Sequence, residues 1–286
     1  MNPLRRYLFL CLLFSALLVA VASAQDLVGK TREVVVPEEQ LISDFARTLG
    51  LAAEHLAWAN DLETTVRLKS GQTVIVPARL VPQSHPQDGV VLNLAERGLY
   101  LFENGVYKEF LPVGIGDEKR ASYHTPTGRF QIISRVKNPD WVAPESDWAE
   151  AMEKDRIDGD SPDNPLGEYW FGFNAPGGGY GLHENTAPRY TGDTVSHGCV
   201  RLYPEHARYL YANHLLEPGD EVWIINRPVR TVTADDGSSL AVKFPSVYGA
   251  TASLSGPGQT TPPTGIPHAT EDTNRTGDRG GLSDQR

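Results

Sequence analysis

The sequence predicts a mainly β protein with few helices, preceded by a small unit of two strands and two helices. Short strand patterns follow one another from Gly89 to Gly116, and Asn104-Gly105 between two of them is a strong hairpin signal. One amphipathic helix is expected later, from Glu205 to about His214. Further strand patterns occupy residues 128–136, 168–174 and 221–226. The chain has 286 residues, 40% of them hydrophobic, which is enough for one large domain and a small module.

The first 24 residues have the pattern of a secretory signal peptide. Arg5 and Arg6 form its positive region, residues 8–21 its apolar region, and Ala22-Ser23-Ala24 its cleavage site. The apolar run is shorter than the roughly 20 residues that a spanning helix needs, so cleavage is favoured over an uncleaved membrane anchor. No later segment is long and apolar enough to span. We therefore expect an exported protein that has no transmembrane segment after cleavage of residues 1–24.

Residues 31–78 are expected to form a compact module in the order strand, helix, helix, strand. The sequence REVVV opens the module and QTVIVP closes it. Between them, Leu41, Ile42, Phe45 and Leu49 recur at helical spacing before Gly50, which is a helix stop signal. A second helix is expected over Ala53–Asn60. Residues 79–88 are then expected to be a linker, because three prolines lie in this segment and the two residues before it.

The rest of the chain is expected to form a main domain and two C-terminal segments. The main domain covers residues 89–228, and within it residues 138–164 are rich in Pro, Asp and Trp and predict an excursion or lid. Residues 229–250 predict an extra hairpin around Asp235-Asp236-Gly237. Residues 251–286 contain almost no large apolar groups and predict a disordered tail.

Acidic side chains outnumber basic ones by 36 to 26, and loss of Arg5 and Arg6 with the signal peptide moves the net charge from −10 to −12. Non-specific affinity for nucleic acid comes from Lys and Arg that neutralise phosphates. The composition therefore argues against nucleic acid as a partner. It also excludes a collagen-like, fully disordered or disulfide-stapled chain.

The residues that carry chemistry lie around one cysteine. The chain has two cysteines, and Cys11 would leave with the signal peptide, so the exported protein keeps Cys199 alone. His197 is two residues away and His183 sixteen. A thiol attacks as the thiolate, and a nearby imidazole supplies the activation. Gly198 lets the backbone approach a substrate carbonyl, and amides beside Cys199 could form an oxyanion hole.

Two other interpretations of these residues stay open at this point. Cys199 could be an inert buried thiol with structural histidines, because cysteine is commonly buried. His183, His197 and Cys199 could also form a thin zinc site. Strand alternation would place His197 and Cys199 on the same side of one strand, which suits either a nucleophile or a metal site. A thiol nucleophile is favoured, but the residues alone do not name the substrate.

The pattern of His183 followed by Ser196-His197-Gly198-Cys199-Val200-Arg201-Leu202 resembles the signature of the YkuD-type L,D-transpeptidases, the cysteine enzymes of bacterial cell-wall cross-linking. The similarity covers about Gly89 to Pro228. Its other landmarks are LPVGIG (111–116), TPTGRF (125–130), SPDNPLG (161–167) and GDEV (219–222). The order of segments matches the ErfK/YbiS-like branch, which implies a periplasmic location.

The N-terminal residues resemble a LysM module, a small fold that binds glycans containing N-acetylglucosamine. The resemblance lies in VVV at the start, AWAN near the end of the second helix, and the closing LKSGQTVIVP. The usual Gly-Asp-Thr after the first strand is replaced by Pro37-Glu38-Glu39-Gln40. Glycan binding and a purely structural role both stay open for this module.

The resemblance to the transpeptidases implies a β-sandwich-like catalytic domain and a role for each residue of the motif. Cys199 would be the nucleophile, and His183 the general base and then the general acid. The backbone carbonyl of Glu184 would orient the imidazole, which explains why no Asp is needed. His197, Gly198 and the Cys199 amide would line the acyl site. No metal or organic cofactor is implied.

Three further residues receive supporting roles. Ser196 would support the loop rather than react, because the thiol is the better nucleophile. Arg201 would either anchor a substrate carboxylate or pair with the acids of its own domain. Trp141 is the best candidate for substrate contact among the tryptophans near the excursion, although packing is favoured for each of them.

The implied reaction has two steps. Cys199 attacks the carbonyl that joins diaminopimelate to the terminal D-Ala of a tetrapeptide stem, and D-Ala leaves. The thioester then passes to an amine, either on the diaminopimelate of another stem or on the lysine of an outer-membrane lipoprotein. Attack by water would instead make an L,D-carboxypeptidase, and the sequence leaves the acceptor open. A non-catalytic peptidoglycan-binding protein is the alternative from another class, and the intact His183 and Cys199 argue against it.

Overall fold

The computed structural model describes residues 27–28, 31–144, 149, 155–233 and 239–249. The expected signal peptide and the expected tail therefore lie outside the described residues. The same holds for the tip of the expected hairpin around Asp235-Asp236-Gly237 and for part of the expected excursion.

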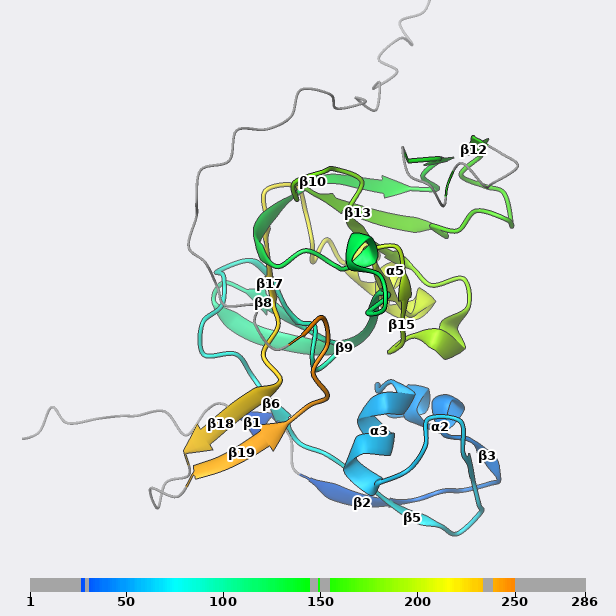
Figure 1. Ribbon diagram of the computed structural model, residues 1–286, viewed down its shortest axis with the longest axis vertical. Coiled ribbons are helices and arrows are strands. Elements are labelled where there is room, and N and C mark those ends of the chain that lie inside the picture. The colour runs from blue at the N-terminus through cyan, green and yellow to red at the C-terminus, as the bar shows by residue number, and fades with distance from the viewer. Residues whose placement is uncertain (1–26, 29–30, 145–148, 150–154, 234–238, 250–286) are drawn as a thin grey trace, which may run out of the picture.

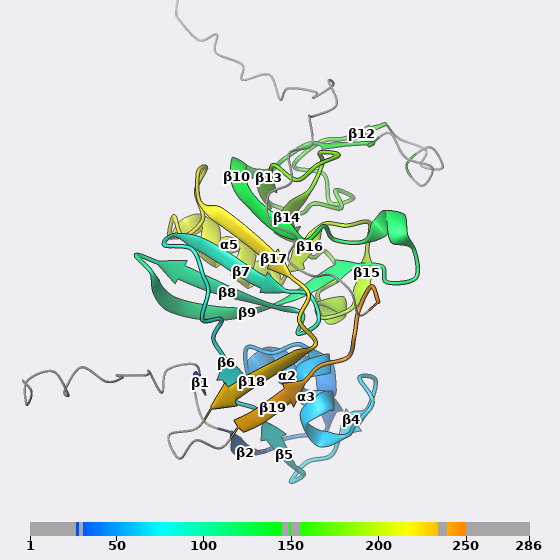
Figure 2. The ribbon, with the colours of Figure 1, turned by 60° about the vertical axis from the view of Figure 1, so that its left-hand side comes forward.

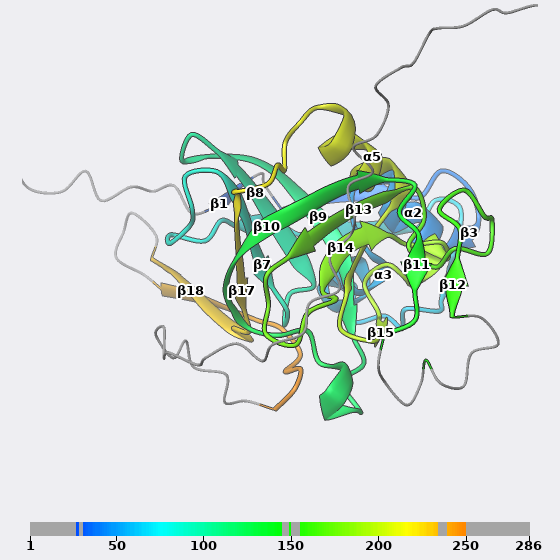
Figure 3. The ribbon, with the colours of Figure 1, turned by 90° about the horizontal axis from the view of Figure 1, so that it is seen from above.

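Two β-sheets that share two long strands form the main domain (Figures 1 and 3). The first sheet contains, in spatial order, β10 (Gly128–Lys137), β17 (Glu221–Ile225), β7 (Gly89–Asn93), β8 (Gly98–Glu103) and β9 (Val106–Gly116). The second contains β9, β16 (Val200–Leu202), β14 (Gly181–Glu184), β13 (Tyr169–Phe173) and β10. The predicted mainly β class with few helices is confirmed.

The strands β9 and β10 are long enough to take part in both sheets. The first half of β9 pairs with β8, and its end pairs with β16 at Val113 and Gly114. In the same way, residues 128–131 of β10 pair with β17, and residues 132–137 pair with β13 across an irregularity after Ile132. Bulges bend a strand and increase its twist. The result is a sandwich that is closed at both edges.

The main core lies between the two sheets. On β7 and β8 the inward residues are Val90, Leu92, Leu99 and Leu101, all buried. The alternate residues on the outer face of these strands are also buried, in a second cluster that includes Tyr100. Strands covered on both faces have near-continuous apolar sequences, as this pair does. Helix α5 (Pro204–Ala212) packs against β13 and β14 and buries Ala207 and Leu210, as its spacing predicts.

Residues 31–78, which we call the N-terminal module, contain two helices enclosed by an antiparallel strand pair. The pair is β2 (Arg32–Val35) with β5 (Thr73–Val76), and the helices are α2 (Ile42–Thr48) and α3 (Ala53–Asn60), close to the positions predicted by apolar spacing. Two short strands, β3 (Gln40–Leu41) and β4 (Arg67–Leu68), pair beside them. Its own core contains Ile42, Phe45, Leu56 and Val74.

The N-terminal module is docked against the main domain through buried polar contacts (Figure 1). The Tyr203 hydroxyl donates a hydrogen bond to the Leu51 carbonyl at 3.2 Å. His55 accepts a hydrogen bond from a backbone N–H at Nδ1, so its Nε2 carries the proton and donates to the Glu96 carbonyl at 2.7 Å. At the rim, Arg47 forms a two-pronged ion pair with Glu205. Buried groups of this kind fix the orientation of one unit on the other.

The segment expected to be a linker is packed rather than loose. Its strand β6 (Arg79–Leu80) pairs with β1 (Leu27–Val28). The Arg79 guanidinium lies over the Phe110 ring at 4.3 Å, and His85 stacks on Phe102 with ring centroids 4.2 Å apart. The segment therefore holds the module in place against the β9 side of the main domain.

Two small strand pairs complete the described structure. Within the expected excursion, β11 (Trp141–Val142) pairs with β12 (Arg156–Ile157). After β17, β18 (Val229–Thr233) pairs with β19 (Ser239–Lys243), where an extra hairpin was predicted, and lies beside the N-terminal module in Figure 2. Among the helices of the described residues, none is both long and apolar enough to cross a membrane.

Candidate active site

The expected site residues gather where β14, β16 and the turn before β16 meet. β14 and β16 run parallel, with His183 opposite Arg201. β16 lies between β14 and β9, so the site is built on the second sheet. A further strand, β15 (Thr194–Ser196), pairs with β9 just before the turn that carries Cys199. The sheet thus fixes both ends of this turn.

The expected placement of His197 and Cys199 on one strand is wrong. β15 ends at Ser196 and β16 begins at Val200, so both residues lie in a turn. Gly198 adopts a φ of 114°, which is favourable for glycine and strained for other residues. A Cβ at this position would also come within 2.7 Å of the Tyr180 ring. A left-handed residue breaks the alternation on which the prediction depended.

The Ser196 hydroxyl braces this turn from within. It donates a hydrogen bond to the Cys199 carbonyl at 2.6 Å and accepts one from the Gly198 N–H at 3.1 Å. The Ser196 carbonyl in turn accepts from the Asp117 N–H at 2.9 Å. Because the Gly198 N–H is already used, it is not a free donor for an oxyanion. The N–H of Cys199, by contrast, has no acceptor among the residues that the structure describes, so it remains a candidate donor for an oxyanion.

His183 is 3% exposed, and a backbone carbonyl orients it. Its Nδ1 lies 2.8 Å from the Glu184 carbonyl oxygen, which can only accept, so Nδ1 carries the proton and Nε2 is an acceptor. Burial and the nearby Arg201 cation lower the pKa of His183 to about 4, against the opposing effect of the Glu184 and Leu166 carbonyls. The imidazole is therefore a neutral base at physiological pH.

Cys199 is a partly exposed free thiol. Its Sγ lies 3.5 Å from the Gly179 carbonyl, to which the S–H can donate. Burial raises the pKa of Cys199, while a hydrogen bond from the Gly181 N–H and the charge of Arg201 act in the opposite direction. These shifts favour the thiol form of Cys199 and the neutral form of His183.

Arg201 lies near both groups without an acid of its own. It forms no ion pair with any of the acids that the structure describes, and its buried Nε has no hydrogen-bond partner there. Burial lowers the pKa of Arg201, and Cys199 partly offsets this. Of the two roles expected for this residue, pairing with acids of its own domain finds no support in the described part of the chain.

Comparison with known proteins assigns this arrangement to a family. The family model of the YkuD L,D-transpeptidase catalytic domain matches residues 87–224, which include the whole site. A Salmonella typhimurium (strain LT2) protein named "Probable L,D-transpeptidase ErfK/SrfK" is 31% identical over 74% of this chain and 69% of its own length. The chain belongs to the YkuD family of L,D-transpeptidases. Members are cysteine-dependent acyltransferases that act on peptidoglycan, and this protein is one of them.

Two further matches are also named as L,D-transpeptidases. An Escherichia coli (strain K12) protein named "Probable L,D-transpeptidase YbiS" is 30% identical over 74% of this chain and 69% of its own length. Among solved structures, the L,D-transpeptidase (residues 123–326) from Xylanimonas cellulosilytica DSM 15894 is 16% identical over 72% of this chain and 100% of that chain, with a TM-score of 0.41.

The other residues expected at the transpeptidase site occupy different surroundings. His197 is exposed, and its ring meets the edge of Tyr123 at 4.4 Å. Burial, with the cations of Arg201 and Arg120, lowers its pKa. Trp141 is 5% exposed on β11, which agrees with the packing favoured for the tryptophans near the excursion. Its contact with substrate stays a prediction.

Two aromatic residues lie beside the motif: Trp170, for which the sequence favours packing, and Tyr180, to which it assigns no role. Trp170 stacks on the His183 ring at 6.1 Å, and its Nε1–H donates to the Ser134 hydroxyl. Tyr180 lies against Gly198, and burial followed by the charge of Cys199 raises the pKa of its hydroxyl. Tyr180 could have been noticed because it precedes His183 by three residues. The position of Trp170 depends on strand pairing, which the sequence does not specify.

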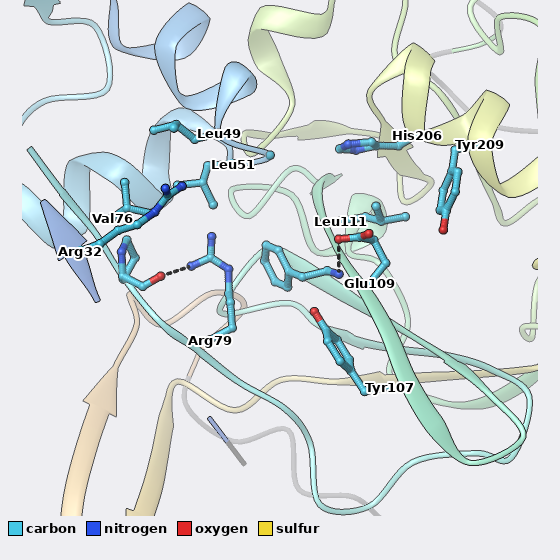
Figure 4. Close-up of a pocket in the computed structure, with 13 residues that line it drawn as sticks. Arg32, Leu49, Leu51, Val76, Arg79, Tyr107, Glu109, Leu111, His206 and Tyr209 are labelled. Carbon is cyan, nitrogen blue, oxygen red and sulfur yellow. Dashed lines mark hydrogen bonds between the residues drawn. The ribbon is translucent and has the colours of Figure 1, made fainter. Parts of the chain in front are cut away.

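The described residues place no group of metal ligands at this transpeptidase site, and the cavity in Figure 4 lies outside it. In the described ranges, no group of three or more His, Cys, Asp or Glu side chains is placed to hold a metal ion. Figure 4 shows a cavity of about 520 Å³ between the N-terminal module, β9 and α5. It is lined by Arg32, Arg79, Tyr107 and His206, among others, and not by Cys199 or His183.

Proposed function

We propose that Cys199 and His183 carry out the transpeptidation as nucleophile and general base. The observation that carries this assignment is the hydrogen bond from His183 Nδ1–H to the Glu184 carbonyl. It leaves Nε2 free to accept a proton, on a strand that pairs directly with the strand following Cys199. A backbone carbonyl here does what a carboxylate does in other triads.

In the first step, Cys199 Sγ attacks the carbonyl between diaminopimelate and the terminal D-Ala of a tetrapeptide stem. His183 Nε2 takes the thiol proton as the C–S bond forms, because both groups start neutral. The Cys199 N–H, for which the described residues supply no acceptor, is the donor for the developing oxyanion. His183 then gives its proton to the leaving amine, the C–N bond breaks, and free D-Ala departs from the thioester.

In the second step, an acceptor amine attacks the thioester. His183 removes a proton from the amine, the C–S bond breaks, and the thiol regains its proton. The acceptor would be the diaminopimelate of another stem or the lysine of an outer-membrane lipoprotein, and water would give a carboxypeptidase. We expect the choice among these acceptors to depend on the surroundings of Cys199, which include the Tyr180 ring against Gly198 and the exposed His197.

Arg201 is proposed to anchor a substrate carboxylate. Two observations support this role. Arg201 has no ion-pair partner among the described acids, and its buried Nε has no acceptor there. A carboxylate is the acceptor that a guanidinium fork binds best. Stem peptides carry carboxylates close to the bond that Cys199 attacks.

The setting of the reaction is proposed from the sequence. Residues 1–24 would direct export, and the mature enzyme would work in the periplasm. The catalytic domain would cover residues 89–228, joined by the 79–88 segment to an N-terminal module of residues 31–78 that resembles LysM. The hairpin would cover residues 229–250, and residues 251–286 would be a tail.

The test is incubation of the mature enzyme with diaminopimelate-type tetrapeptides, followed by intact-protein mass spectrometry and analysis of the muropeptides. Release of D-Ala, an acyl-enzyme on Cys199 and new diaminopimelate-linked dimers are expected for the wild type. Cys199→Ala and His183→Gln should give none of these, whereas His214→Gln, which changes an exposed histidine just after the C-terminal end of α5, should match the wild type. Full activity in Cys199→Ala would overturn the assignment. Release of D-Ala without dimers would indicate that water, and not an amine, accepts the acyl group.

A further inference from the structure

A glutamate of the N-terminal module reaches the loop that leads to the catalytic turn. Glu54, at the start of α3, is 4% exposed. Its Oε2 lies against Gly192, where an added Cβ would come within 2.0 Å of it. Gly192 has a φ of 109° and belongs to the loop between β14 and β15. Only a glycine leaves room for the carboxyl group at this point.

The surroundings of Glu54 favour a protonated carboxyl group, because burial and Asp193 raise its pKa. Arg97 Nη1 lies 3.9 Å from Oε1, and the residue's own N–H also donates to the carboxyl group. Oε2, however, has no N–H or hydroxyl donor among the described residues. Asp193, the residue after Gly192, brings a second carboxyl group to this contact, and its hydrogen bonding and charge both act to raise the pKa of Glu54. Two carboxyl groups form a hydrogen bond when one of them carries a proton.

Asp193 connects this contact to the catalytic turn. Its carbonyl accepts a hydrogen bond from the Ile115 N–H at 3.0 Å. The next residue, Thr194, begins β15, which ends at Ser196. Ser196 in turn braces Gly198 and Cys199. A path of side-chain and backbone contacts therefore leads from the N-terminal module to the backbone of Cys199.

We propose that Glu54 is a positioning residue for the catalytic turn: its protonated carboxyl group donates to Asp193 and fixes the loop between β14 and β15 in the arrangement that places Cys199. This inference rests on the proposed role of Cys199. It makes the N-terminal module part of the working enzyme, whether or not the module binds glycan.

The surroundings of Glu54 define the pH range in which the contact would open. Burial raises the pKa of Glu54 to about 8, helped by the hydrogen bond to Asp193 and its charge, while Arg97 opposes the shift. The other ionisable groups that face it do not titrate between pH 6.5 and 9: burial lowers the pKa of His55 to about 3, and burial raises that of Tyr203 above its ordinary value. Arg97 is a permanent cation. Loss of the Glu54 proton would place two carboxylates in contact.

The test compares the wild type with Glu54→Gln and Asp193→Asn in the full chain. Each amide can donate to the remaining carboxylate at any pH, so both variants should keep the contact where the wild type loses it. At pH 9 roughly one tenth of a carboxyl group with a pKa near 8 stays protonated. The kcat for D-Ala release, relative to either variant, should therefore fall by up to about tenfold between pH 6.5 and 9, with KM for the donor unchanged. Glu205→Gln, which removes an exposed carboxylate from the same interface, is the matched control and should follow the wild type.

A second measurement does not need catalysis. It follows hydrogen exchange of the peptide covering residues 185–196 in a Cys199→Ala background, corrected for intrinsic exchange rates. Exchange should accelerate above pH 8 in the chain that keeps Glu54 and should not accelerate in the chain with Glu54→Gln. Identical pH profiles for all chains, with unchanged protection of this peptide, would overturn the inference. If D-Ala release fails in every chain while the exchange difference remains, the role of Cys199 is wrong and the contact between module and loop stands.

Discussion

Removal of the Ser196 hydroxyl is the most direct test of how the catalytic turn is held. The side chain is 1% exposed and makes two hydrogen bonds inside the turn, to the Cys199 carbonyl and from the Gly198 N–H. In Ser196→Ala both backbone groups lose their partner, and Gly198 is buried. A buried polar group left without a partner costs about 1–3 kcal/mol. The free energy of unfolding should therefore fall by about 3 kcal/mol, or roughly 6–12 °C in Tm for a chain of this size.

The effect of Ser196→Ala on activity should exceed its effect on folding. Without the hydroxyl the turn can relax, and the Cys199 N–H moves away from the position of the oxyanion. Loss of one oxyanion donor lowers kcat by about 10²–10³-fold, and we expect the lower part of this range because the donor is displaced rather than removed.

The assay is urea unfolding at pH 7 together with the single-turnover rate of acyl-enzyme formation. Ser196→Thr is the matched variant, since it keeps the hydroxyl, and its rate should lie within about tenfold of the wild type despite one extra buried methyl group. A Ser196→Ala enzyme with a wild-type acylation rate and a change in unfolding free energy under about 0.5 kcal/mol would refute this account of the turn.

Three further predictions concern groups around the site. Glu184→Gln should keep kcat within a few-fold, because His183 is held by the backbone carbonyl of residue 184 and not by its side chain; a loss comparable to that of His183→Gln would contradict this. Tyr248→Phe removes a hydroxyl that donates to the Gly116 carbonyl at 2.8 Å, and thermal unfolding should show a loss of about 1–2 kcal/mol, an unchanged Tm being the contrary result. Burial lowers the pKa of His183 to about 4 and that of His55 to about 3, so both favour the neutral form in the folded protein. The free energy of unfolding should therefore be unaffected by these histidines above pH 6.5 and fall as the pH drops from 6.5 towards 4, by up to about 1.4 kcal/mol per pH unit for each. Urea titrations of His55→Gln should show a smaller fall than the wild type. An equal fall would contradict the assignment.

The strands were predictable where local signals determine them. The hairpin at Asn104-Gly105 and the apolar runs of β7 and β8 need only neighbouring residues to form, and they lie where the sequence predicts them. The closure of the sandwich was not predictable in this way. It depends on β9 and β10 each changing partner midway, at pairings between segments that are distant along the chain.

The same distinction holds for the site. The identity of Cys199, His183 and Ser196 as candidates followed from their spacing and from the family signature. Their geometry did not, because strand alternation fails at Gly198, which has a φ of 114° and leaves no room for a Cβ beside the Tyr180 ring. The burial of Trp141 likewise depends on a strand pairing that no local pattern specifies.

Arg201 acts on both members of the proposed catalytic pair, His183 and Cys199, and its charge therefore affects the strength of the proposed base. After burial, its charge is the main cause that lowers the pKa of His183, and it also favours the thiolate form of Cys199. For proton transfer from the thiol to the imidazole these two effects oppose each other, so the free enzyme gains little from the cation. A substrate carboxylate bound to Arg201 would neutralise the charge and move the pKa of His183 from about 4 back towards its ordinary value, because the cation no longer disfavours the imidazolium. The base would then strengthen when the donor peptide is in place, while Cys199 would lose the same cation that favours its thiolate. NMR titration of His183 in the Cys199→Ala enzyme should show this rise in pKa on addition of a tetrapeptide. The same enzyme with Arg201→Gln added should show the raised pKa without any ligand. If the pKa of His183 is the same in the free enzyme, the tetrapeptide complex and the Arg201→Gln variant, Arg201 does not control the strength of the base.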